Sequence, residues 1–300
     1  MGTSKTNDGP GDKTPLLPDW AQGDDDDLPF PDGNEPLPND NLPDERPPEI
    51  TPDEKDPPDV EQPPPNGEQV SPEISKPWQQ AKSNLTRFTK TGGKRELANA
   101  GRSYVKARGG ARRAAQSSSA GRIATGRVIG FLSRIATNGI ADALESIGLR
   151  DILGQSVEAT LAAIMNKLAP SGAGLDESAA RKAVDLALVS IFEEYGVEAD
   201  GVDRLDEMDG AGVEKAFQTV VSEYVFQRWL SELGKRLEEG AVSASEALRL
   251  ETIAKECIVE AIQLDFRDYD ILGTDWGGSE SQQIINDIYE QAYVFLEDLQ

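Results

Sequence analysis

The sequence predicts an all-α protein in which a body of about six helices follows a long, disordered, acidic and proline-rich N-terminal arm. Of the 19 prolines, all but Pro170 lie at or before Pro77, so little interrupts helix formation in the rest of the chain. From Gly121 onward, apolar residues recur at the three- and four-residue spacing of a helix face. No segment alternates with the period of two that indicates a half-buried strand.

Charge divides the chain into three blocks. Residues 1–75 carry 20 acidic and 4 basic side chains, a net charge of −16. Residues 76–134 carry 14 basic and 1 acidic side chain, a net of +13, and residues 135–300 carry 12 basic and 33 acidic ones, a net of −21. Together with composition, these blocks predict four parts: a recognition head (1–20), a Pro/Asp/Glu-rich linker (21–75), a basic, glycine-interrupted segment (76–120) and an α-helical domain (121–300).

The linker at 21–75 contains too little apolar surface to offset the entropy that ordering it would cost. Its prolines remove hydrogen-bond donors and favour extended backbone, while its carboxylates repel one another. We therefore expect this linker to stay disordered.

The basic segment contains one expected helix, Arg95–Lys106, between glycine pairs at 92–93 and 109–110. Cations interspersed with aromatic residues are typical of nucleic-acid binding, here over 82–134. The acidic blocks on both sides offer a competing interpretation, because masking within the chain or docking on an acidic partner explains the charge equally well. The candidate basic patch comprises Arg87, Lys94, Arg95, Arg102, Lys106, Arg108, Arg112 and Arg113.

The first helix of the body is expected over 122–148, where Gly126 and Gly130 would let another backbone approach closely. Its apolar face is predicted to contain Ile123, Val128, Phe131, Leu132, Ile135 and Ile140. The remaining helices are expected at 157–168, 177–195, 211–240 and 243–266, and from 279 almost to the C-terminus.

Capping residues define several of these helix ends. Asp176 is predicted to cap the helix at 177–195, and Gly196 to follow its C-terminus. The pairs Ser243 with Glu246 and Ser279 with Gln282 have the spacing of capping boxes and predict the starts of the last two helices.

Residues that the sequence lacks exclude most catalytic chemistry. Without histidine there is no Ser-His-Asp or Cys-His arrangement and no imidazole metal ligand. The single cysteine, Cys257, is expected to face the core. Asp268, Asp270 and Gly273 match part of a calcium loop, but Leu272 replaces a required ligand, so an acidic interhelical loop is favoured. Carboxylates are abundant and would permit acid/base catalysis in principle, but no pair stands out as buried against an apolar wall. We therefore expect no catalytic residue, no metal and no cofactor.

The N-terminal head begins "MGTS", continues with "GPG" and ends in "PLLPDW". A tail that only solubilises has no use for two leucines and a tryptophan, which suggests that another protein binds this end. One cysteine is consistent with a reducing cytoplasm. The acidic start does not have the pattern of a secretory signal, and no apolar run approaches the ~18 residues that a membrane-spanning helix needs.

Three further strings, together with the head, resemble those of a known family: "TRFTKTGGKREL" at 86–97, "AGRSYVKARGGARRAA" at 100–115 and "GFLSRIATNGIADAL" at 130–144. The chain resembles the QatB family, the accessory proteins of the Qat anti-phage defence system. That resemblance implies a QueC-like enzyme (QatC-type) as partner, together with an ATPase (QatA-type) and a TatD-like nuclease (QatD-type). Defence relatives of QueC attach a deazaguanine to the N-terminal glycine of a protein. The chain would then be the non-enzymatic substrate and adaptor.

The resemblance makes Gly2 the candidate modification acceptor. Removal of Met1 would expose an α-amine with a reference pKa of ~7.7–8.0, so part of it is neutral and nucleophilic near pH 7. Glycine has no Cβ to obstruct a narrow active site. An N-myristoylation pattern ending at Thr6 is also present, but the following aspartates oppose binding to anionic membranes. The candidate head contacts with the partner are Thr3, Ser4, Gly9, Pro10, Gly11, Leu16, Leu17 and Trp20.

Overall fold

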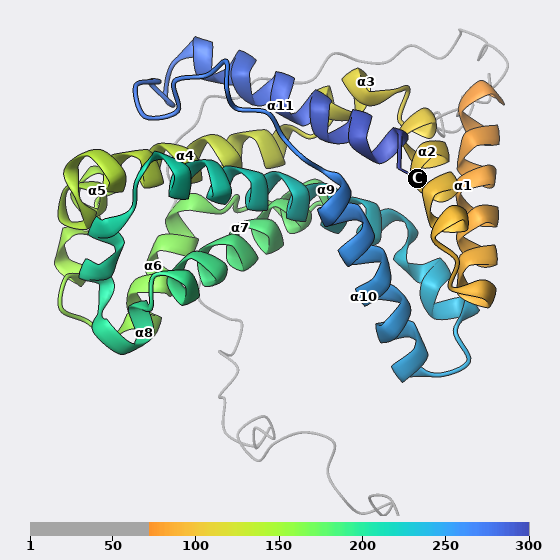
Figure 1. The fold of residues 1–300 in the computed structure, drawn as a ribbon, viewed down its shortest axis with the longest axis horizontal. Helices are drawn as coiled ribbons and strands as arrows, with labels where there is room; N and C mark the ends of the chain where they lie inside the picture. Colours follow the sequence, from red (N-terminus) through yellow and green to blue (C-terminus); the bar gives the residue numbers. More distant parts are fainter. Residues whose placement is uncertain (1–71, 300) are drawn as a thin grey trace, which may run out of the picture. The chain divides into compact units, whose positions relative to one another are not determined.

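The computed structural model describes residues 72–299, with side chains from residue 76 onward. Within this part of the chain 79% of residues are helical and none lies in a strand, which confirms the all-α class (Figure 1). The longer helices are α1 (Pro72–Thr91), α2 (Lys94–Ala107), α4 (Ser119–Asn138), α6 (Val157–Leu168), α7 (Leu175–Glu194), α9 (Gly210–Gly240), α10 (Ala244–Ala261) and α11 (Ser279–Glu297). Shorter helices are α3 (Ala111–Gln116), α5 (Ile140–Ser146) and α8 (Val197–Asp200), with 3₁₀ turns η2 (Arg150–Ile152) and η3 (Val202–Glu207).

The six helices expected in the body correspond to α4, α6, α7, α9, α10 and α11, and α2 corresponds to the helix expected in the basic segment. Helix α1 was not predicted. Its buried residues Ala81, Leu85 and Phe88 recur every three or four positions, so one face of α1 packs against the body although most of its other residues are polar.

The predicted helix at 122–148 is in fact two helices. α4 ends at Asn138, because Gly139 adopts a φ of +87°, a value that favours glycine and breaks the helix. α5 then begins at Ile140, whose N–H donates to Asp206 Oδ1 at 2.6 Å. A carboxylate from the distant η3 turn thus supplies the cap that the local sequence does not.

Two of the expected caps are confirmed. Ser243 Oγ accepts from Glu246 N at 3.2 Å at the start of α10, and Gly196 has the left-handed φ of +65° expected after α7. Two others are wrong. α7 begins at Leu175, and Asp176 directs its carboxylate to other helices. α11 begins at Ser279 itself and has no side-chain cap. α10 also ends at Ala261, earlier than expected.

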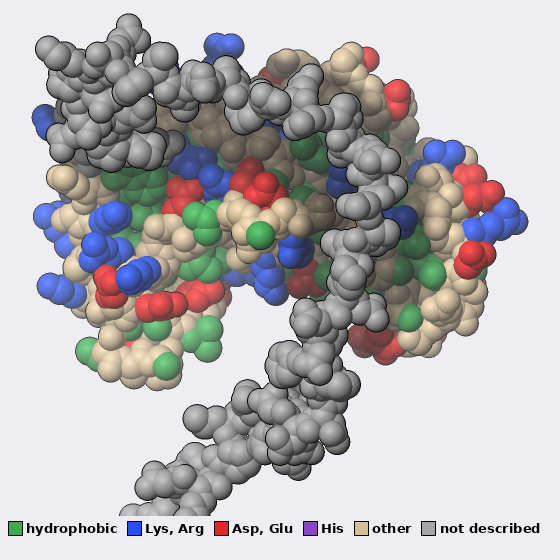
Figure 2. All heavy atoms as spheres, turned by 180° about the vertical axis from the view of Figure 1, so that it is seen from behind, with side chains coloured by type: hydrophobic (Ala, Val, Ile, Leu, Met, Phe, Trp, Pro, Cys, Tyr) green, Lys and Arg blue, Asp and Glu red, His purple; other side chains and the backbone are tan. Residues whose placement is uncertain are grey.

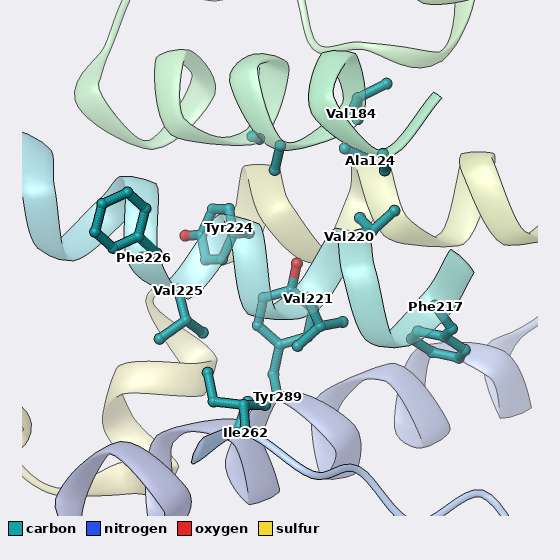
Figure 3. Packing of buried hydrophobic residues seen from close by; sticks show 14 of the residues in the cluster. Ala124, Val184, Phe217, Val220, Val221, Tyr224, Val225, Phe226, Ile262 and Tyr289 are labelled. Atoms are coloured by element: carbon teal, nitrogen blue, oxygen red, sulfur yellow. The ribbon is translucent and has the colours of Figure 1, made fainter. Parts of the chain in front are cut away.

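α9 is the central element of the core. It packs against α1, α4, α7, α10 and α11. Its largest buried side chains, Phe217, Tyr224 and Trp229, are fully shielded from solvent. Figure 3 shows the ring of Tyr224 beside that of Tyr289 from α11, and their centroids are 5.3 Å apart. Burial of these aromatic rings, together with that of the more numerous aliphatic side chains of the core, drives this helical packing.

The basic segment belongs to the same packed structure. α1 packs on α2 and α9, while α2 and α3 pack on α11. Leu97, Tyr104 and Ala114 are buried in one hydrophobic cluster with residues of α4, α7 and α9. Residues 76–120 therefore share a core with residues 121–299, although their charge is opposite.

Candidate binding surfaces

Seven of the eight candidate basic-patch residues have exposed side chains. They lie on α1, α2 and α3, and Figure 2 shows many Lys and Arg side chains on the side of the molecule that carries α1. Arg102 Nε also donates to the carbonyl of Glu297 at 3.2 Å, which joins α2 to the end of α11. The exposed members are Arg87, Lys94, Arg95, Arg102, Lys106, Arg112 and Arg113.

Arg108, the eighth member, differs from the rest because its charge is neutralised within the chain. Its Nη1 lies 2.9 Å from Glu232 Oε1 of α9, and the two side chains are only 14% and 10% exposed. Arg228 Nε contacts the same carboxylate oxygen at 2.6 Å. Arg108 therefore belongs to a buried ion network and contributes little to the outer surface.

This network continues to Asp176 in the first turn of α7. Asp176 Oδ1 lies 2.7 Å from Arg228 Nη1 and also accepts a hydrogen bond from the hydroxyl of Tyr224. Its other oxygen, Oδ2, accepts from Ala120 N at 2.9 Å in the first turn of α4. A single carboxylate thus links α7 to α9 and places a negative charge at the N-terminus of α4, where the helix dipole favours it.

Four tyrosines surround the network: Tyr104, Tyr224, Tyr289 and Tyr293, all fully buried. The hydroxyls of Tyr289 and Tyr293 form hydrogen bonds of 2.9 Å with Thr125 and Ser118 of the α4 region. Burial raises the pKa of each of these four phenols above its usual value. We assign this cluster a structural role, because three of the four hydroxyls form hydrogen bonds inside the body; the fourth, that of Tyr104, has no hydrogen-bond partner among the described residues.

A groove of about 1060 Å³ runs along the outer face of α4. The loop between α10 and α11 and the start of α11 form one wall, while the end of α6 contributes Lys167 and Leu168. We call it the α4 groove; its main lining residues are Arg122, Ile123, Gly126, Arg127, Gly130, Arg134, Lys167, Leu168, Trp276, Gln282 and Ile285.

The two glycines predicted to permit close approach form the floor of the α4 groove. A Cβ on Gly130 would lie 3.0 Å from Trp276 Cβ, and one on Gly126 would lie 3.0 Å from Ile285 Cδ1. The neighbours that approach α4 here are therefore a loop and the side chains of α11. Ile123 was expected on the buried face but is 55% exposed, beside this groove.

The other residues that the sequence singled out are Cys257 and the aspartates of the loop after α10. Cys257 is half-buried rather than fully buried, and burial raises the pKa of its thiol, which disfavours the nucleophilic thiolate. In the loop after α10, Asp270 Oδ1 accepts from Gly273 N and Asp275 Oδ1 from Gly277 N. Between residues 76 and 299 no group of three acidic or cysteine side chains could hold a metal ion. The head residues, from Gly2 to Trp20, lie outside the described residues.

Comparison with known proteins decides the family. The family model described as "QatB: Qat anti-phage system associated protein QatB" matches residues 109–296, more than half of the chain. The chain belongs to the QatB family. The resemblance stated from the sequence is thereby confirmed. No curated protein and no solved structure matches the chain.

The QatB match runs from the start of α3 almost to the end of α11. It includes Asp176, Arg228 and Glu232 of the ion network and all the α4 groove residues. The head, the linker, α1 and all of α2 precede the matched region. Among the described helices, none combines the length and apolar content needed to cross a membrane.

Proposed function

We propose that this QatB-family chain is the non-enzymatic substrate and adaptor of a QueC-like partner enzyme within the Qat defence system. Gly2 accepts a deazaguanine-type modification on its α-amine, and the helical body docks other components, among which the ATPase and the TatD-like nuclease are the candidates. The partner enzyme then catalyses the modification of Gly2, and this reaction takes place in the cytoplasm.

The family match carries this proposal, because it assigns the helical body to the Qat system. The composition of the chain supports the assignment of catalysis to the partner: the sequence has no histidine, and its one thiol has a raised pKa, which disfavours nucleophilic catalysis by cysteine. The head supports the substrate role, since an unhindered glycine amine precedes stiffening prolines and the apolar anchors Leu16, Leu17 and Trp20.

Modification of Gly2 is tested by the mass of the N-terminal peptide after co-expression with the partner enzyme. Gly2→Pro removes the primary amine and Gly2→Val adds a branched side chain beside it, so both should abolish the mass shift. Leu16→Ala with Leu17→Ala should weaken recognition by about 2–5 kcal/mol for each leucine that is fully buried in the partner.

The matched control is Asp53→Asn with Glu54→Gln in the linker, for which the sequence predicts length rather than contacts with the partner. This variant should be modified like the wild type. An unmodified Gly2 in cells that resist phage would contradict the substrate role.

The runner-up function is nucleic-acid binding through 82–134, which the seven exposed cations of the basic patch favour. Arg112→Glu with Arg113→Glu distinguishes the two functions, because both side chains lie on the outer surface of α3. If the patch docks an acidic protein, this variant should lose partner co-purification, and the wild type should show negligible affinity for DNA or RNA.

Arg108→Glu is a second variant, which tests the ion network rather than the outer surface. It would place a carboxylate against Glu232 inside the ion network, so it should destabilise folding whichever ligand the surface binds. Salt-sensitive binding of a DNA duplex by the wild type, lost in the Arg112/Arg113 variant while folding persists, would instead establish the runner-up.

A further inference from the structure

The α4 groove contains three cations that have no ion-pair partner among the described residues. They are Arg122, Arg127 and Lys167, and the last two are exposed. Arg122 Nη2 donates to the carbonyl of Gln116 at 3.1 Å, while its buried Nε has no hydrogen-bond partner within the described part of the chain. Three positive charges are therefore available to a ligand, although residues 135–300 have a net charge of −21.

The other charged residues of the groove already have partners. Arg134 Nε lies 2.6 Å from Asp142 Oδ2, so this exposed pair adds no net charge. Asp275 is the acidic residue of the lining, and its Oδ1 accepts from Gly277 N at 3.0 Å within its own loop. The groove thus selects an anionic ligand, and either carboxylates or phosphates would satisfy its cations.

The length of the groove favours a polymer over a compact molecule. Its lining residues run along α4 from Ser119 to Asn138, a distance of roughly 28 Å at 1.5 Å per residue. An extended peptide of about eight residues spans that distance at ~3.3 Å per residue. A fitting ligand is therefore an extended chain that carries negative charge.

The apolar side chains of the groove favour a protein over a nucleic acid. Ile123 and Leu272 line it and are 55% and 37% exposed, but aliphatic side chains offer no ring face on which a base could stack. Trp276 is only partly exposed. Its ring packs edge-to-face on that of Phe217 with centroids 5.5 Å apart, and its Nε1 donates to the carbonyl of Ile271 at 3.0 Å. The lining thus suits bulky apolar side chains better than bases.

We propose that the α4 groove binds an extended acidic segment of another protein, in which carboxylates alternate with bulky apolar side chains. The carboxylates pair with the three unpaired cations, and the apolar side chains cover Ile123 and Leu272. Ion pairs with exposed cations are individually weak, so apolar contacts supply much of the affinity and the charges supply selectivity. This proposal rests on the docking role of the body in the proposed function, but not on the modification of Gly2.

Fluorescence anisotropy of a fluorescein-labelled peptide with the full-length chain tests the proposal. The peptide has about eight residues, in which glutamates flank a leucine and a tryptophan. One control peptide has glutamine in place of each glutamate, and the other has serine in place of the leucine and the tryptophan. We expect saturable binding of the first peptide, binding weaker by about tenfold or more for each control, and a similar loss in about 0.5 M salt.

Substitutions in the chain locate the site. Arg127→Glu with Lys167→Glu reverses two exposed cations of the groove and should weaken peptide binding by about tenfold or more. The matched control, Lys82→Glu with Lys90→Glu, makes the same change of charge at exposed positions of α1, outside the groove lining, and should bind like the wild type. Ile123→Ser should weaken binding by about threefold or more without changing any charge. Far-UV circular dichroism verifies that the variants stay folded.

The proposal is overturned if the acidic peptide binds no better than its controls, or if neither the groove reversal nor Ile123→Ser weakens its binding. Binding of a fluorescein-labelled single-stranded DNA that the groove reversal abolishes, without binding of the peptide, would assign the groove to nucleic acid. A dimer in sedimentation velocity that the same reversal dissociates would assign it to a second copy. No partner enzyme is present in these measurements. Absence of peptide binding with Gly2 modified in cells therefore contradicts the docking alone, and peptide binding with Gly2 unmodified contradicts the substrate role alone.

Discussion

Replacing Asp176 with alanine should lower the free energy of unfolding of the helical body by about 3 kcal/mol. The side chains of Asp176 and Arg228 are only 16% and 11% exposed, so the substitution leaves a largely buried guanidinium with Glu232 as its remaining anionic partner. It also removes the acceptor for Ala120 N in the first turn of α4. Urea denaturation followed by circular dichroism measures the change.

The matched control is Asp185→Ala in the same helix. Asp185 pairs with Lys182 at 3.2 Å, but both side chains are substantially exposed, so its loss should cost about 0–1 kcal/mol. Equal, small effects of the two substitutions would show that the ion network does not hold α4, α7 and α9 together.

The contacts of the Asp176 side chain could not be predicted from the sequence. An aspartate directly before a helical pattern predicts an N-cap, because the rule considers only neighbours along the chain. The atoms that Asp176 contacts belong to Ala120, Tyr224 and Arg228, each about 50 residues away. The residue type and its place near a helix start were predictable, whereas its partners depend on how α4, α7 and α9 pack.

The division of the first body helix has a similar cause. Ile140 continues the apolar period of α4 beyond Gly139, so the pattern alone predicts one helix. The break becomes favourable because Asp206, from η3, caps the new helix start. Strongly periodic segments such as α6, α9 and α2 were located to within a residue or two, because their own sequences contain both the period and the terminal glycines or proline.

The α4 groove was predictable only in part. The positive charge of residues 76–134 indicated a basic surface, and Gly126 with Gly130 indicated a close approach. However, the same apolar period placed Ile123 in the core, and no local signal showed that the loop around Trp276 would form the opposite wall. That wall comes from residues about 145 positions further along the chain, which only the tertiary structure brings together.

The body should lose stability steeply as the pH rises above about 10. Burial raises the pKa of Tyr104, Tyr224, Tyr289 and Tyr293 in the folded state, while in the unfolded chain each phenol titrates near 10. Above that pH the unfolded chain has lost protons that the folded one retains, so stability is full below pH 10 and falls as the pH rises towards the folded pKa values. Each tyrosine contributes roughly 1.4 kcal/mol per pH unit, and the four together about 5.5 kcal/mol per unit.

Tyr104→Phe isolates this effect from the titration of surface lysines. The hydroxyl of Tyr104 has no hydrogen-bond partner among the described residues, so its removal should leave stability at pH 7 unchanged or raise it by about 1 kcal/mol. Tyr289→Phe, which removes the hydrogen bond to Thr125, should instead cost about 1 kcal/mol at pH 7. Urea unfolding measured from pH 8 to 11 tests this. Above pH 10 the free energy of unfolding of each variant should fall by about 1.4 kcal/mol less per pH unit than that of the wild type, because its unfolding releases one proton fewer. A slope that neither substitution changes would mean that these phenols ionise as readily in the folded protein as in the unfolded chain.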